Sequence, residues 1–105
     1  MYVVIWKFVV KAGCEAEFEE AYGRHGVWAE FFRRGKGYQG TELLRDESSP
    51  ECYITVDRWQ SRASYEKFQA SYAAEYKAID QRCETLTESE TRVGAFSSVD
   101  ESASS

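Results

Sequence analysis

The chain has 105 residues, a formal net charge of −5 at pH 7 and an aromatic content of 15%. This length predicts one domain with a thin but real hydrophobic core. Phosphate binding requires clustered Lys and Arg, whereas the basic residues here are scattered, so the composition excludes a nucleic-acid partner.

Residues 2–11 predict the first strand, because they are rich in β-branched and aromatic side chains and end just before a glycine. Both faces of this strand are apolar, so we expect it to be covered on both sides. From Cys14 to Phe32 the apolar residues recur every three or four positions, which predicts a helix. Gly23 and Gly26 interrupt this pattern and predict a bend or a break into two helices.

Two further strands are predicted at residues 38–45 and 52–59, joined by a polar hairpin loop that contains the only proline. Ser61 is suited to cap a second helix. The apolar stripe of that helix comprises Tyr65, Phe68, Tyr72, Tyr76, Ile79 and Cys83. A last strand is predicted at residues 90–96. We expect residues 1–96 to form the domain and residues 97–105 to be a disordered tail.

The order of these elements, β-α-β-β-α-β, predicts an α+β fold of the ferredoxin-like type. Its four-stranded antiparallel sheet would carry two helices on one face. The opposite face is also apolar, and a second copy of the same sheet is its simplest cover. We therefore expect a homodimer through the open sheet face, which is a dimeric α/β barrel.

The three cysteines, Cys14, Cys52 and Cys83, lie far apart and form no C-x-x-C pair. With a single histidine in the chain, they predict reduced thiols in a cytoplasmic protein and no metal site. The apolar run near the N-terminus is interrupted by Lys7 and is too short to span a bilayer. No membrane partner is expected.

Four segments of the chain resemble the antibiotic biosynthesis monooxygenase (ABM) domain family: "VVKAG", "FEEAYGRHGVWAEFF", "GYQGTELLRD" and, above all, "YITVDRWQSRASYEKF". The resemblance covers residues 2–96 and implies the dimeric fold. It is less specific for chemistry, because the family includes quinone-forming oxygenases, haem-degrading enzymes and members of unknown activity. Haem-degrading relatives use an Asn on the first strand and a His on the second helix. The corresponding residues here are Trp6 and Ala78, which argues against haem cleavage.

The resemblance implies a cofactor-independent monooxygenase that acts on a small aromatic molecule of the polyphenol or quinone type. Such a reaction requires a dry cavity, a base and a group that stabilises the developing anion. An aromatic cavity between the sheet and the helices would suit flat ligands. The side chains that we expect to line this cavity are Trp6, Trp28, Tyr53, Trp59, Phe68, Tyr72 and Tyr76.

Each expected lining residue also has a structural interpretation, because an aromatic helix stripe is usually part of the core. His25 is a candidate catalytic base, since its unperturbed pKa lies near neutrality. A single histidine on a helix between two glycines is nevertheless more often structural. Both interpretations of His25 stay open at this point.

Asp57 is the second candidate base. It is adjacent to Arg58 on a strand, so the two side chains face opposite sides of the sheet. If Asp57 shares the face of Trp59, it lies near the cavity; otherwise it forms half of a salt bridge across the dimer interface. The alternative function is a non-catalytic dimeric module that binds a small apolar ligand or a partner protein.

Overall fold

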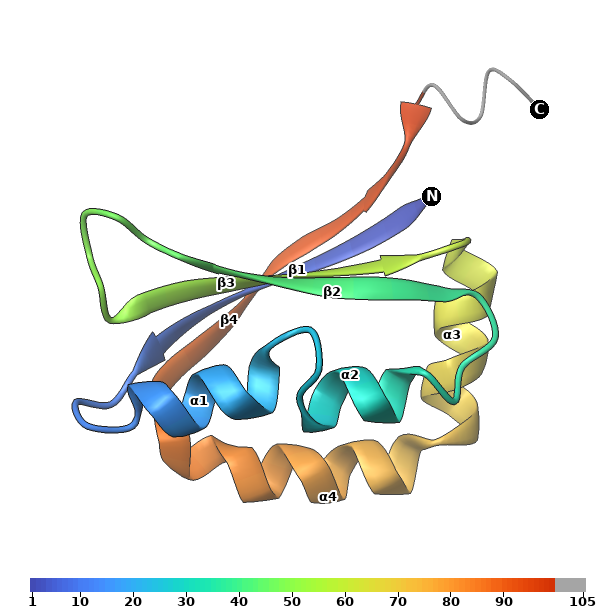
Figure 1. Cartoon of the computed structure of the whole chain (residues 1–105). Coiled ribbons are helices and arrows are strands. Elements are labelled where there is room, and N and C mark those ends of the chain that lie inside the picture. Colours follow the sequence, from blue (N-terminus) through green and yellow to red (C-terminus); the bar gives the residue numbers. More distant parts are fainter. Residues whose placement is uncertain (100–105) are drawn as a thin grey trace.

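The structure, a computed structural model, describes residues 1–99. It contains one four-stranded antiparallel sheet in the order β2-β3-β1-β4, and the helices lie on one of its faces (Figure 1). This arrangement confirms the predicted ferredoxin-like α+β fold. Residues 100–105 of the expected tail lie outside the described residues.

The four strands are β1 (Tyr2–Val10), β2 (Tyr38–Arg45), β3 (Cys52–Trp59) and β4 (Thr87–Ser97). The first three match their predicted positions to within one residue. The fourth begins three residues earlier than predicted, because its pairing with β1 continues as far as Val10 and Thr87. The start of β4 is polar, so this pairing, and not local composition, determines where the strand begins.

The first helical segment is broken into α1 (Glu15–Tyr22) and α2 (Val27–Phe32), as the glycines predict. Gly26 is the N-cap of α2. A Cβ atom at this position would lie 2.3 Å from the carbonyl oxygens of both Glu20 and Ala21. Gly26 therefore allows the chain to turn directly against the end of α1, which explains the glycine without any catalytic role.

The second helical segment is also broken, into α3 (Arg62–Ser71) and α4 (Ala73–Cys83), and the 3-10 helix η1 (Glu84–Leu86) follows. The prediction of one continuous helix was wrong. Tyr72 leaves helical geometry with φ −123° and ψ 26°, and its ring packs on those of Phe31 and Phe68. This contact with α2 is tertiary, so the local sequence contains no signal for the break.

The N-terminus of α3 is capped as predicted. The backbone N–H of Ser64 donates a hydrogen bond of 3.1 Å to the Oγ of Ser61. Within residues 1–99, no helix is long and apolar enough to cross a membrane.

The hydrophobic core lies between the sheet and the helices, and most of the helix-facing side chains of β1 and β3 are buried in it. The opposite face of the sheet is uncovered in Figure 1. Leu44, Ile54 and Phe96 are 47%, 36% and 50% exposed, respectively, although all three are large and apolar. The register pairs Leu44 with Ile54 and places Phe96 opposite Val3. The open face therefore exposes large apolar side chains, as predicted.

Candidate functional site

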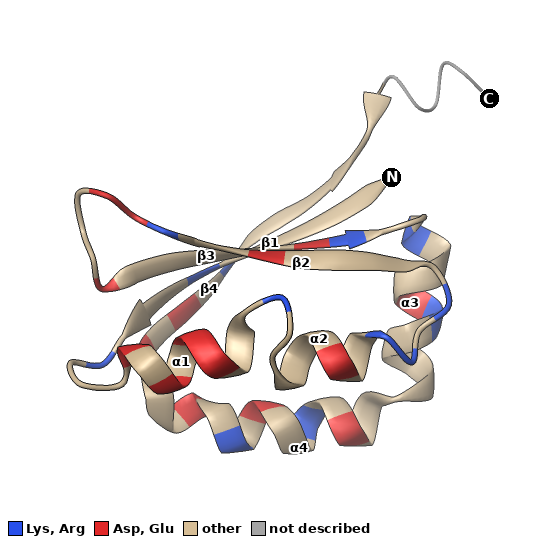
Figure 2. Ribbon diagram, viewed as in Figure 1, with Lys and Arg blue, Asp and Glu red and all other residues tan. Residues whose placement is uncertain are grey.

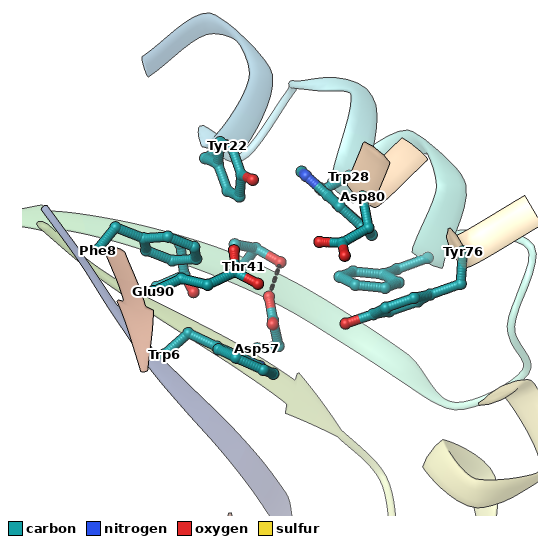
Figure 3. Close-up of a pocket in the computed structure, with 11 residues that line it drawn as sticks. Trp6, Phe8, Tyr22, Trp28, Thr41, Asp57, Tyr76, Asp80 and Glu90 are labelled. Atoms are coloured by element: carbon teal, nitrogen blue, oxygen red, sulfur yellow. Dashed lines mark hydrogen bonds between the residues drawn. The ribbon is translucent and has the colours of Figure 1, made fainter. Parts of the chain in front are cut away.

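A cavity opens between the sheet and helices α1, α2 and α4 (Figure 3). Its volume is about 40 Å³, which is room for about three water molecules. The empty space between the lining side chains, with the open mouth included, is about 410 Å³. The lining combines aromatic, hydroxyl and carboxyl side chains, and its members are Trp6, Phe8, Tyr22, Trp28, Phe32, Thr41, Thr55, Asp57, Tyr76, Asp80 and Glu90.

Asp57 is the buried acid of this cavity and is only 8% exposed. It lies on the helix-facing side of β3, where its register partners are Val4 of β1 and Thr41 of β2. The Oγ1 of Thr41 donates a hydrogen bond of 2.6 Å to Oδ1 of Asp57. The hydroxyl of Tyr38 lies 2.5 Å from the same Oγ1. Because Thr41 has only one hydroxyl proton, Tyr38 is the donor in that second contact.

Burial raises the pKa of Asp57 to about 6, and the hydrogen bond from Thr41 opposes the rise. A carboxyl group with this pKa exchanges its proton close to neutral pH, which suits a general base. The interface salt bridge considered for Asp57 is wrong, because the side chain faces the cavity. Arg58 lies on the other face of the sheet and pairs with Glu42 at 2.7 Å.

Two further carboxyl groups lie at the mouth of the cavity, Asp80 on α4 and Glu90 on β4. Figure 2 shows acidic residues on both elements. Asp80 is half-buried and Glu90 is exposed. Partial burial raises the pKa of Glu90, and the negative charge of Asp80 raises it further. The carboxyl groups of Asp80 and Glu90 are therefore close enough to repel each other. Within the described part of the chain, no Lys, Arg or His lines the cavity.

Trp28 contributes a buried indole N–H for which the structure shows no hydrogen bond within residues 1–99. The Tyr22 hydroxyl and the Cys83 thiol lie beside this N–H and gain some stabilisation of their anions from it. The indole N–H is therefore enclosed in the core beside these two side chains and is not exposed to the cavity. In Figure 3 it points toward the hydroxyl of Tyr22.

The two tyrosines of the cavity stay protonated. Burial is the main cause that raises the pKa of Tyr22 and of Tyr76 well above its ordinary value. Their hydroxyls can therefore donate hydrogen bonds to a ligand at any physiological pH.

The structure brings four of the nine predicted site residues together in this cavity: Asp57, Trp6, Trp28 and Tyr76. The other five lie outside its lining: His25, Tyr53, Trp59, Phe68 and Tyr72.

Three of the five residues outside the lining belong to an aromatic cluster around α3. The rings of Trp59 and Tyr72 both pack on Phe68, at centroid distances of 5.2 and 4.9 Å. Tyr53 is buried further along the sheet, where its hydroxyl donates a hydrogen bond of 2.6 Å to Oε2 of Glu19. Their contacts are those of core residues.

His25 is exposed in the turn between α1 and α2. It lines shallow depressions on the outer surface, and its Nδ1 lies 3.5 Å from Nη2 of Arg33. Figure 2 shows basic residues in the loops on both sides of α2, which is where this surface lies. Of the two candidate bases, Asp57 is therefore the one that faces the cavity.

Seven lining residues escaped prediction: Phe8, Tyr22, Phe32, Thr41, Thr55, Asp80 and Glu90. Two of them have a signal in the sequence. Thr55 shares a strand face with Asp57, and Asp80 follows Tyr76 by four positions and so places a carboxylate beside the apolar stripe of a helix. Glu90 lies in a polar stretch and has no comparable signal.

The ferredoxin-like fold of the chain is shared with several solved structures. One is a variant of SnoaB, a cofactor-independent oxygenase from Streptomyces nogalater (21% identity, TM-score 0.71, covering 93% of this chain and 92% of that chain). Another, from Deinococcus radiodurans, is described as a candidate antibiotic biosynthesis monooxygenase (14% identity, TM-score 0.73, covering 93% and 92%). A third is a variant of MhuD with two manganese protoporphyrin IX molecules bound per active site (22% identity, TM-score 0.68, covering 94% and 95%).

These similarities show a shared fold, which does not by itself determine the reaction. The sequence matches the antibiotic biosynthesis monooxygenase family over residues 1–82, so the chain belongs to that family. A comparison with curated protein sequences finds no match.

Proposed function

We propose that the protein is a cofactor-independent monooxygenase that oxidises a small, electron-rich aromatic molecule of the polyphenol or hydroquinone type. The observation that carries this proposal is the buried carboxyl group of Asp57, with a pKa of about 6, in a cavity lined by aromatic rings. A base of this strength can take a proton from an acidic phenol or anthrone near neutral pH. Membership of the family supports the same conclusion.

In the proposed reaction, Asp57 first takes a proton from the substrate. The resulting anion transfers one electron to O₂, and the two radicals combine with formation of a C–O bond. The peroxide then takes up the proton held by Asp57. The hydroperoxide then loses water, because the hydrogen that remains on the oxygenated carbon leaves as a proton and the O–O bond breaks. A methylene group and O₂ thus become a carbonyl group and water, and the substrate supplies all the electrons.

The remaining polar groups of the cavity would stabilise the substrate anion. The hydroxyls of Tyr22 and Tyr76 stay protonated and can donate hydrogen bonds to it. Figure 3 shows these side chains around the same space as Asp57. Donors that are fixed in a poorly solvated site stabilise a developing negative charge more than water does.

We also propose that the protein forms a homodimer through its open sheet face. Leu44, Ile54 and Phe96 expose apolar surface on that face. Large apolar side chains exposed on a sheet face are typical of an interaction surface, and a second sheet would cover them. The alternative of a non-catalytic binding module uses the same dimer and the same cavity.

The test is oxygen uptake by the purified protein with a panel of anthrones and hydroquinones and no added cofactor. We expect uptake by the wild type and its loss in Asp57→Asn, which has the same shape but cannot act as the base. The control is Glu66→Gln, an exposed carboxylate on α3 that pairs with Arg62. If no compound is consumed although the panel quenches tryptophan fluorescence, the binding module is the correct function.

A further inference from the structure

Thr41 lies between two recesses of the molecule. On one side it lines the cavity that contains Asp57, and on the other it lines a shallow depression of the outer surface that also includes Tyr38 and His25. Asp57 borders only the cavity, and Tyr38 borders only the depression. The side chain of Thr41 therefore separates the buried candidate base from the solvent on the outer surface.

Two hydrogen bonds connect the two sides. The hydroxyl of Tyr38 lies 2.5 Å from Oγ1 of Thr41, which in turn lies 2.6 Å from Oδ1 of Asp57. Figure 3 draws the second of these bonds. A hydroxyl group can donate one hydrogen bond and accept another at the same time, so a proton can pass along such a row of oxygens. The row is continuous from the outer surface to the carboxyl group.

A bulge in β2 makes this row possible. Residues three apart in a regular strand face opposite sides of the sheet, so Tyr38 and Thr41 would point apart. The pairing of β2 with β3 is irregular between Tyr38 and Gly40, and Gly40 has a φ of +126°. The extra residue turns both hydroxyls to the same side. The rings of Phe32 and Trp59, at centroid distances of 5.7 and 5.3 Å, hold the ring of Tyr38 in place.

The outer end of the row reaches solvent. The depression beside Tyr38 is open to the surface and has a volume of about 360 Å³. Burial raises the pKa of Tyr38, while the hydrogen bond with Thr41 and the charge of Arg33 oppose this rise. Tyr38 therefore stays protonated at neutral pH, and it passes on a proton only when it receives another. The charged and titratable side chains that line the depression with it are Arg24, His25 and Arg33.

A ligand in the cavity would close the direct route between Asp57 and solvent. Asp57 is only 8% exposed, and the cavity beside it holds about three water molecules, which an aromatic ring would displace. Four other titratable groups line the cavity, and within residues 1–99 none of them is hydrogen-bonded to Asp57: Tyr22, Tyr76, Asp80 and Glu90. The row through Thr41 is then the connection that remains.

We propose that Thr41 and Tyr38 form a proton path through which Asp57 exchanges its proton with the outer surface while a ligand fills the cavity. When Asp57 loses its proton, that proton moves to Oγ1 of Thr41. The Thr41 proton moves to the hydroxyl oxygen of Tyr38, and the Tyr38 proton moves to water in the depression. Three O–H bonds break and three form, and the reverse sequence protonates Asp57. The use of this path in turnover rests on the proposed function, whereas proton exchange itself does not.

The experiment measures how fast Asp57 loses its proton when the cavity is filled. The protein is saturated with 1-hydroxyanthraquinone, an aromatic compound that is already oxidised, and the pH is raised rapidly from 5 to 8, across the pKa of about 6. Time-resolved infrared spectroscopy follows the C=O band of the protonated carboxyl group, which is assigned by its absence in Asp57→Asn. We expect Tyr38→Phe to slow the loss of this band about tenfold or more.

The comparison variants separate the path from a structural role. Tyr38→Phe keeps the hydrogen bond from Thr41 to Asp57, so the rate should change while the midpoint of the Asp57 titration stays nearly the same. Without the compound, water in the cavity provides a second route, so Tyr38→Phe should then have little effect. Thr41→Val should slow the filled protein in the same way, and Thr41→Ser should not. Tyr72→Phe removes a hydroxyl outside the cavity and should keep the wild-type rate.

Equal rates in the wild type and Tyr38→Phe with the compound present would overturn the proposal. A slowing that is just as large without the compound, or that also occurs in Tyr72→Phe, would overturn it as well. The measurement consumes no O₂, so its outcome is independent of the oxygen-uptake test of the function.

Discussion

Thr41 donates a hydrogen bond of 2.6 Å to Asp57 across the β2–β3 ladder, and the two residues are direct register partners. The hydroxyl of Tyr38 donates in turn to Thr41. These two successive hydrogen bonds hold Oδ1 of the buried Asp57 carboxylate against β2. It also favours the ionised form of a group whose pKa is raised by burial.

Replacement of Thr41 by valine, which has nearly the same shape, should raise the pKa of Asp57 further. A hydrogen bond to a charged group contributes about 1.5–3 kcal/mol, so the acid limb of the rate profile should move up by about one pH unit or more. The measurement is the pH dependence of oxygen uptake, together with an NMR titration of the Asp57 carboxyl carbon. Thr41→Ser should restore the wild-type profile. An unchanged titration in Thr41→Val would show that the hydrogen bond has no effect on the base.

Asp57→Asn should abolish turnover and at the same time stabilise the protein. The pKa of Asp57 rises from 3.8 to about 6 on folding. The folded state therefore binds the proton more tightly, and this group makes the free energy of unfolding fall as the pH rises from about 4 to about 6. Removal of the ionisable group should add up to about 3 kcal/mol at pH 7.5 and little at pH 3.

Urea unfolding of the wild type and Asp57→Asn at pH 3 and pH 7.5 measures this effect. The variant should gain stability only at the higher pH, and the m-value should stay the same. Equal changes at both pH values would mean that packing, and not ionisation, causes the difference.

His25→Ala should keep oxygen uptake within about twofold of the wild type, because the imidazole lies on the outer surface and not in the cavity. A surface substitution of this kind usually changes stability by less than about 0.5 kcal/mol. The measurement is the same uptake assay, with circular dichroism to verify folding. A loss of turnover with unchanged ligand binding would instead assign His25 a part in the reaction.

The difference between His25 and Asp57 shows what the sequence could and could not reveal. Helices and strands follow from residue type and period, and β3 was predicted at its observed position for that reason. The face of the sheet that carries Asp57 depends on which face the helices cover, so the sequence left two alternatives open. The hydrogen bond from Thr41 depends on the register of two strands, which local pattern does not determine.

Gly35→Ala should destabilise the protein, although Gly35 lies outside the cavity. A Cβ atom there would lie 2.6 Å from Cδ1 of Phe68 and 2.8 Å from Cζ3 of Trp59. Both rings are buried and pack on each other, so the added methyl group should cost about 1–3 kcal/mol. Thermal unfolding measures this effect, and the midpoint should fall by several degrees. An unchanged midpoint would show that the rings around Trp59 can move apart.

Ile54→Glu should convert the proposed dimer into a monomer. Ile54 lies on the open sheet face beside its partner Leu44, and a carboxylate there would be buried without a counter-ion when two sheets meet. Ala74→Glu places the same charge on an exposed position of α4 and should leave the dimer intact. Light scattering during gel filtration gives the mass of both variants and of the wild type. A monomeric wild type, or a dimer that persists in Ile54→Glu, would contradict pairing through this face.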